Sequence, residues 1–196
     1  MKPFVYTISS LFVFILLLGG CAQKAQVYVP LSAYTPTAAV LQKSGAIYLA
    51  GVTDARKNRS VIGYILKNDK PVTKILTKDS IEKWFASAIT EALNAEGCRV
   101  LRKPIRNPNV ATVRIRIDKL EARLDRGKLT GENLTAAVKV TLSIQQQNTK
   151  IIKHVGLIRK KWVPPFSTEE TIRDYLQQTL DEVVENVREQ IDQYRF

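Results

Sequence analysis

Three consecutive segments between residues 111 and 163 alternate apolar and polar side chains, and this alternation constrains the fold more than any other feature of the chain. In VRIRID and similar stretches the apolar side chains occupy every second position, whereas a helix would repeat them about every 3.6 residues. The polar stretches DRGK (125–128) and QQQNTK (145–150) separate the segments and predict turns. The pattern predicts three long strands in an antiparallel meander with one apolar and one polar face.

The alternation changes phase once inside the first of these segments. Apolar side chains fall on odd positions in residues 113–117 but on even positions in residues 120–124. One extra residue in the strand would bring both sets to the same face, so we predict a β-bulge near Asp118 or Lys119.

Two other segments repeat apolar residues at helical spacing. The first covers residues 81–93 and stops before Gly97, a residue type suited to the left-handed turn after a helix. The second covers residues 172–191 and follows a pair of prolines. The candidate caps are Thr77 or Asp79 for the first helix, and a capping box of Ser167 and Glu170 for the second.

Shorter strands precede the first helix. AIYLAGVTD (46–54) is a compact apolar run with polar ends, and SVIGYIL and KPVTKIL flank KND, which predicts a hairpin around Asn68 and Asp69. The order of elements is strand, hairpin, helix, strand, meander, helix. We therefore predict an α+β fold in which a mostly antiparallel sheet has two helices packed on one face, preceded by a signal peptide and a flexible tether.

The first 20 residues have the parts of a secretory signal, with Lys2, an apolar middle and small residues at the end. Leu18-Gly19-Gly20-Cys21 resembles the bacterial lipobox, which implies cleavage before Cys21 and acylation, including palmitate, at that residue. Several acyl chains would give stable anchoring. An uncleaved signal anchor, or a secreted protein cut elsewhere, are the alternatives. Ala22 is not the Asp that often retains lipoproteins in the inner membrane, which favours the outer membrane.

These features divide the chain into three parts. Residues 1–20 form the signal peptide that is removed, residues 21–44 a lipidated N-terminus and tether rich in small and polar residues, and residues 45–196 a single periplasmic domain.

The charge balance is strongly basic, with a formal net charge of +12. Nucleic acid is the usual partner of such a charge, but an exported chain does not meet it. Anionic lipid, lipopolysaccharide phosphates or an acidic envelope protein are then the candidate partners. The alternative is that the charge only keeps the domain soluble.

The sequence offers no pattern for catalysis. His154 is the single histidine and has no second ligand at metal-binding spacing, and no GxSxG elbow, P-loop or dinucleotide fingerprint occurs. Glu121, Asp125 and Glu132 cluster around the DRGK turn, where solvation explains these carboxylates as well as catalysis does. With Cys21 acylated, Cys98 has no disulfide partner in the chain and is predicted to be a buried, inert thiol, although an intermolecular disulfide remains an alternative. We expect no enzyme activity, no cofactor and no metal.

Two groups of basic residues are candidates for binding. Asp54 at a strand exit suits a structural role in the following turn, while nearby arginines could pair with acids or hold a phosphate bidentately. Several basic residues of the meander fall on its polar positions, where a solvated positive face is the alternative to a binding surface. The candidate binding surface consists of Arg56, Arg59, Arg114, Arg116, Lys139 and Lys153.

The sequence resembles the YajG-type bacterial envelope lipoproteins. The matching features are the lipobox, VTDARKNRSVIG (52–63), IEKWFASAITEALNAEGCRV (81–100), the VRIRIDKLEA strand (113–122) and the terminal helix. The resemblance implies an outer-membrane lipoprotein facing the periplasm and carries over no catalytic residues. We therefore expect a binding or accessory module that contacts an anionic glycolipid or a partner protein. The alternative is a structural subunit of an envelope assembly, such as a secretion, flagellar or lipid-transport machine. Oligomeric state is not predicted.

Overall fold

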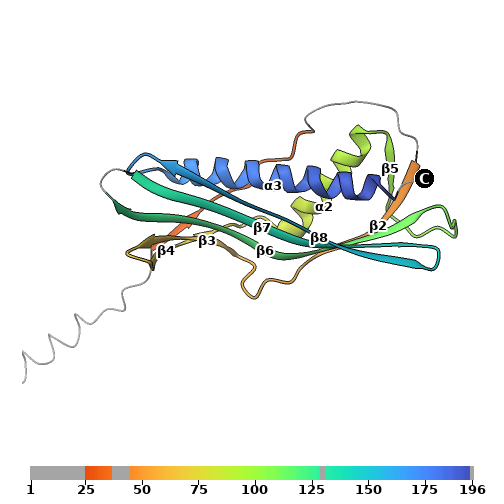
Figure 1. The fold of residues 1–196 in the computed structure, drawn as a ribbon, viewed down its shortest axis with the longest axis horizontal. Helices are drawn as coiled ribbons and strands as arrows, with labels where there is room; N and C mark the ends of the chain where they lie inside the picture. Colours follow the sequence, from red (N-terminus) through yellow and green to blue (C-terminus); the bar gives the residue numbers. More distant parts are fainter. Residues whose placement is uncertain (1–24, 37–44, 129–130, 195–196) are drawn as a thin grey trace, which may run out of the picture.

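A computed structural model of the protein describes residues 25–36, 45–128 and 131–194. In this part of the chain, eight strands form one sheet and two helices lie on one of its faces (Figure 1). The elements in chain order are β1 (Ala25–Tyr28), β2 (Gly45–Asp54), β3 (Val61–Lys67), β4 (Lys70–Leu76), α2 (Ile81–Ala95), β5 (Cys98–Leu101), β6 (Ala111–Lys128), β7 (Gly131–Gln146), β8 (Thr149–Val163) and α3 (Glu169–Asp192).

The long strand β6 organises the sheet. Along one side it pairs with β7, which pairs in turn with β8, so the antiparallel meander is confirmed. Along the other side β6 pairs with β2 over its first half and with β3 over its second half, both in parallel. β5 adds to β2, while β4 and β1 add to β3.

The prediction of a mostly antiparallel sheet is wrong. Of the seven strand pairings in the described residues, four are parallel: β1 with β4, β2 with β5, β2 with β6, and β3 with β6. The sheet is mixed because α2 carries the chain back across it before β5, and β6 then inserts between β2 and β3. Two parallel neighbouring strands need a long crossover connection, and the segment that contains α2 provides one.

Register shifts confirm the predicted bulge. The pairing of β6 with β7 shifts between Ile117 and Lys119, which keeps Leu120 and Leu124 on the buried face. The β3–β4 hairpin also turns where predicted, with positive φ at Asn68 and Asp69 as a tight hairpin turn requires. β6 itself continues through the DRGK stretch to Lys128, so the prediction of a turn at 125–128 is wrong.

The core lies between the helices and the sheet. α2 packs on β2 and β5, and α3 packs along β6, β7 and β8. Phe85 of α2 and Val183 of α3 are fully buried, in one core cluster with strand residues such as Ile115 and Leu142. Two helices on one sheet face are therefore confirmed. Neither helix among the described residues is both long and apolar enough to cross a membrane.

Both helix caps differ from the prediction. Ser80 caps α2 by accepting a hydrogen bond from the Lys83 amide. Asp79 instead accepts from the Leu31 amide, far away in the sequence. Thr168, and not Ser167, is the N-cap residue of α3, and its side chain makes no capping bond. The Ser167 hydroxyl donates to the Pro164 carbonyl instead.

The predicted tether is wrong for residues 25–36. β1 pairs in parallel with β4, and Val29 and Tyr34 after it are buried. The Trp84 indole donates to the Ser32 carbonyl over 2.7 Å, and the Ser32 amide donates to Gln177. Burial of two apolar side chains and a free sheet edge to pair with explain why these residues pack. The signal peptide, Cys21 and residues 37–44 lie outside the described residues.

Candidate functional site

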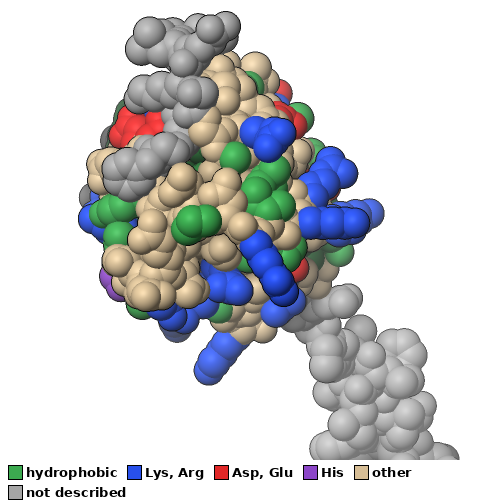
Figure 2. Space-filling view, turned by 90° about the vertical axis from the view of Figure 1, so that its right-hand side faces the viewer, with side chains coloured by type: hydrophobic (Ala, Val, Ile, Leu, Met, Phe, Trp, Pro, Cys, Tyr) green, Lys and Arg blue, Asp and Glu red, His purple; other side chains and the backbone are tan. Residues whose placement is uncertain are grey.

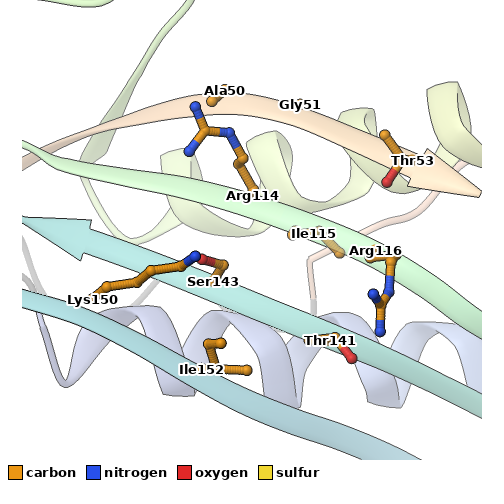
Figure 3. A pocket seen from close by; sticks show the side chains of 10 residues that line it. All are labelled: Ala50, Gly51, Thr53, Arg114, Ile115, Arg116, Thr141, Ser143, Lys150 and Ile152. Carbon is orange, nitrogen blue, oxygen red and sulfur yellow. The ribbon is translucent and has the colours of Figure 1, made fainter.

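The sheet face opposite the helices has a hollow of about 440 Å³ at the bulged part of β2 (Figure 3). Its position follows from the strand alternation, because Val113, Ile115 and Leu142 point into the core and their neighbours point out. The hollow lies where β2 shifts register between Leu49 and Gly51. The residues that line it are Ala50, Gly51, Thr53, Arg114, Ile115, Arg116, Thr141, Ser143, Lys150 and Ile152.

Three cationic side chains surround this hollow. Arg114 of β6 extends toward Ala50, Arg116 extends toward Thr141, and the Lys150 side chain runs beside Ser143 (Figure 3). Arg116 forms an ion pair with Asp118, with 2.7 Å between nitrogen and oxygen. Within the described residues, neither Arg114 nor Lys150 has an ion pair. The hollow therefore has an excess of positive charge.

A polar network borders the hollow. The Thr141 hydroxyl lies 2.5 Å from Asp118 Oδ2, to which it donates, and 3.1 Å from His154 Nδ1. In a serine- or threonine-type nucleophile the histidine lies between the hydroxyl and the acid and accepts the hydroxyl proton. Here the hydroxyl lies between the other two groups, so this arrangement holds Asp118 and His154 in place and does not activate Thr141. No cluster of His, Cys, Asp or Glu in the described chain could hold a metal ion.

Arg56 is not part of an open surface. Its guanidinium binds Asp54 through Nε at 2.9 Å and Nη2 at 2.6 Å, and its Nη1 donates to the Val61 carbonyl. Asp54 is 2% exposed and also accepts from the Arg56 amide, which confirms its structural role in the turn. Burial alone would raise the pKa of Asp54, but the hydrogen bonds and charge of Arg56 outweigh it and lower the pKa. Arg56 is thus a buried structural residue, contrary to its candidate binding role.

The other predicted binding residues separate into two faces. Arg114, Arg116 and Lys139 share the open face. Lys153 pairs in register with buried Leu142 on the helix face, and its ammonium lies 5.7 Å from the centre of the Tyr194 ring. Arg59 is exposed beside Glu82, in the loop between β2 and β3. The structure brings Arg114 and Arg116 together at the hollow and excludes Lys153 from it.

Sequence reasoning missed Lys150 and the hydroxyl groups of Thr53, Thr141 and Ser143. Lys150 was taken as part of a turn, but it pairs in register with Gln145 at the start of β8. Lys150 has an even residue number, as does His154, which lies on the polar face. This alternation is the one sequence signal that could have placed Lys150 on that face.

The end of the molecule next to the hollow is also basic. Figure 2 shows lysine and arginine side chains projecting from much of this end. They belong in part to β5 and to the loop before β6. Among the described residues, Arg99, Arg102, Lys103 and Arg106 are exposed there without ion pairs. The buried thiol of Cys98 lies at the start of β5, as predicted.

Comparison with protein families decides the broad class. A family of uncharacterized lipoproteins matches residues 34–190. The chain belongs to this family of bacterial lipoproteins. The lipoprotein prediction is therefore confirmed at family level, and association with the cell envelope follows from it. No curated protein matches the chain in a sequence comparison.

Two crystal structures show a similar fold. One is of an uncharacterized protein, with a TM-score of 0.53 and 11% identity, covering 86% of this chain and 99% of that one. The other is of a protein from Xanthomonas campestris, with a TM-score of 0.52 and 16% identity, covering 83% of this chain and 92% of that one. At these identities the likeness concerns the fold alone.

Proposed function

We propose that this lipoprotein is a non-enzymatic binding module of the YajG type, anchored in the outer membrane through acyl groups on Cys21 and facing the periplasm. Its open sheet face binds an anionic group of an envelope partner. The lipobox and the family membership support the anchor. The observation that carries the binding role is the hollow in which Arg114 and Lys150 have no ion pair within the described residues.

The chemistry of the hollow suits a phosphate or a carboxylate. A guanidinium donates two parallel hydrogen bonds to such a group, and an ammonium adds a point charge. The hydroxyls of Thr53 and Ser143 can donate further hydrogen bonds. Small-molecule sites measure roughly 300–1,000 Å³, so the hollow has room for a charged group with part of its carrier. The carrier is either a phosphorylated glycolipid or an acidic segment of a protein.

Variants of the hollow test this proposal in the purified full-length protein. Arg114→Glu combined with Lys150→Glu should weaken binding to lipopolysaccharide by roughly tenfold or more, because two cations become anions. Lys57→Glu combined with Lys83→Glu is the matched control, since both lysines are exposed outside the hollow, and should change binding by less than about twofold. An equal loss in both variants would contradict a specific site.

A second arm distinguishes the two carriers. Dephosphorylated lipopolysaccharide should lose binding if phosphate is the ligand. A photo-crosslinking residue in place of Ser143, which lines the hollow, should capture an acidic envelope protein in cells if carboxylates are the ligand. No binding to lipopolysaccharide and no crosslinked protein would together overturn the binding role.

The structural-subunit role remains a second candidate because of the free edge of β8. In the described chain this 15-residue strand pairs only with β7. An open edge can pair with a strand of another chain. Lysines along β8, such as Lys153 and Lys161, disfavour that pairing, so this role ranks second. A complex of fixed stoichiometry in native mass spectrometry of the lipidated protein would favour it, and a monomer would count against it.

A further inference from the structure

The chain enters the domain at one defined end. β1 begins opposite the middle of β4, with Ala25 beside Thr73 and three residues past Lys70 at the β3–β4 turn, and it runs parallel to β4, away from that turn. Cys21 precedes Ala25 by four residues, which span at most about 14 Å of extended chain. If acyl groups on Cys21 hold the protein, this end of the domain must lie close to the bilayer.

Strand register shows what else lies at this entry end. Lys67 at the end of β3 pairs with Arg126 near the end of β6, and Glu132 at the start of β7 pairs with Val163 at the end of β8. The turn from β8 to α3 follows directly. Figure 1 shows the β3–β4 turn and the start of α3 at the same end of the molecule. We define the entry end by residues 67–72, 126–127 and 162–167.

Large apolar side chains are exposed at the entry end. Phe166 is 86% exposed, Trp162 59% and Val72 41%. Val72, Pro165 and Phe166 line a shared hollow of about 480 Å³ between the β3–β4 hairpin and the turn before α3. Tryptophan concentrates where a membrane meets water, because its ring contacts lipid while its N–H stays hydrated, and an exposed phenylalanine beside it adds apolar surface for the same contact.

The backbone holds Phe166 in its exposed position. Its φ of 64° lies in the left-handed region that non-glycine residues rarely adopt. The Phe166 amide donates to Oε1 of Glu132, which is 4% exposed, and Arg126 donates to the Ser167 carbonyl over 2.9 Å. An exposed aromatic residue kept in a strained conformation by hydrogen bonds from the backbone around it to buried Glu132 and to Arg126 indicates a built protrusion.

We propose that the entry end docks on the bilayer surface, with Phe166 and Trp162 in the headgroup region. The proposal rests on the anchor at Cys21 given under the proposed function. The entry end carries both signs of charge: Lys67, Lys70 and Arg126 are basic, Asp69 is acidic, and Arg126 is paired with Glu132 of β7. With this small net charge apolar contact dominates, and the docking depends only weakly on salt.

This docking would orient the whole molecule. Ten residues of β6 separate Arg116 at the hollow from Arg126 at the entry end, which corresponds to about 33 Å along a strand. The anion-binding hollow would then face the periplasm, away from the membrane that holds the anchor.

A fluorescent label tests the proposal in the full-length lipidated protein. Phe166→Cys and, as a matched control, Ile105→Cys each receive an environment-sensitive dye. Ile105 is exposed and apolar but lies in the loop before β6, at the opposite end. The unsubstituted protein measures background, since Cys98 is buried. The proteins are reconstituted in vesicles of phosphatidylethanolamine and phosphatidylglycerol that carry a spin-labelled quencher lipid.

The fluorescence emission of the dye at position 166 should move to shorter wavelength, and the quencher lipid should remove roughly half of its intensity or more. The dye at position 105 should show neither change. Equal quenching at both positions would overturn the docking. A shift at 166 without quenching would overturn it too, because a protein partner or second copy would then cover this end.

The same samples separate this proposal from the proposed function. Mass spectrometry reads the acylation of Cys21 directly, so a failed anchor is recognised as such. The anion-binding test uses Arg114 and Lys150 at the other end, and its outcome does not affect the label at position 166.

Discussion

At the residue scale, Gly63 allows a close approach between β3 and β6. It pairs with Ala122 where β3 lies beside β6. A Cβ atom at Gly63 would overlap the carbonyl oxygen of Ala122, and that backbone atom belongs to the central strand and cannot move aside. Gly127 of the same sheet has no atom within 4 Å of a Cβ position.

This contrast predicts the outcome of two alanine substitutions. Gly63→Ala should destabilise the protein by roughly 1–3 kcal/mol through overpacking. Gly127→Ala should leave the free energy of unfolding within about 0.5 kcal/mol. Urea unfolding followed by circular dichroism measures both. Equal stability of the two variants would show that β3 can shift away from β6.

The Asp54–Arg56 pair predicts a dependence on pH. Because the folded state lowers the Asp54 pKa, its stabilisation is present above the unfolded value near 4 and is lost as the pH falls below it. Asp54→Asn should therefore cost roughly 1–3 kcal/mol at pH 7, since Arg56 loses a charged acceptor. The difference from the unsubstituted protein should shrink at pH 3. Urea unfolding at both pH values tests this, and a constant difference would rule out the ionised pair as its source.

At the element scale, residues 25–36 act as a strap across both helices. The Tyr34 hydroxyl donates to Glu185 of α3, and the Trp84 indole of α2 donates to the Ser32 carbonyl. Burial and the neighbouring carboxylate Glu185 raise the pKa of Tyr34, so the phenol stays protonated and remains a donor at neutral pH. The strap thus joins the segment after Cys21 to the folded domain.

Replacing the buried tyrosine should release this strap. Tyr34→Ala should cost roughly 3–5 kcal/mol, as for other large buried aromatic side chains, and should expose residues 25–36 to protease. Tyr28→Ala is the matched control, because Tyr28 is 54% exposed on β1. Limited proteolysis with mass spectrometry should find early cleavage in this segment only for Tyr34→Ala. Early cleavage in both variants would mean that the strap is already open.

At the scale of the whole molecule, charge is divided between the two sheet faces. α3 on the covered face holds eight acidic and two basic residues. The open face has Arg114, Arg116 and Lys139, and the adjacent end adds basic residues such as Arg102. This small domain therefore has an acidic helix on one side of its sheet and a basic candidate binding face on the other.

Salt should separate the two proposed contacts. Raising the salt from about 0.05 to 0.5 M shortens the screening length severalfold, so binding at the hollow should weaken strongly. Quenching of the label at position 166 should change little, because apolar contact dominates there. A parallel loss of both signals would show that the entry end is held by charge.

Sequence periodicity alone determined the elements and their faces. Alternation and helical spacing are local properties, so the meander, the bulge, the hairpin and both helices could be predicted from it. Parity likewise placed Arg114, Arg116 and Lys139 on one face. It failed for Lys153 because β8 has apolar residues on both faces, such as Ile152 on the open one.

Tertiary structure decided the features that depend on residues distant in the chain. Alternation reports which face a side chain occupies but not which strand lies beside it, so the parallel pairings of β6 with β2 and β3 could not be predicted. The burial of Arg56, the packing of residues 25–36 and the hollow beside Lys150 depend on such pairings. Each requires contacts that form only when the strands assemble into the sheet, because chain topology, and not sequence spacing, brings the partner groups together.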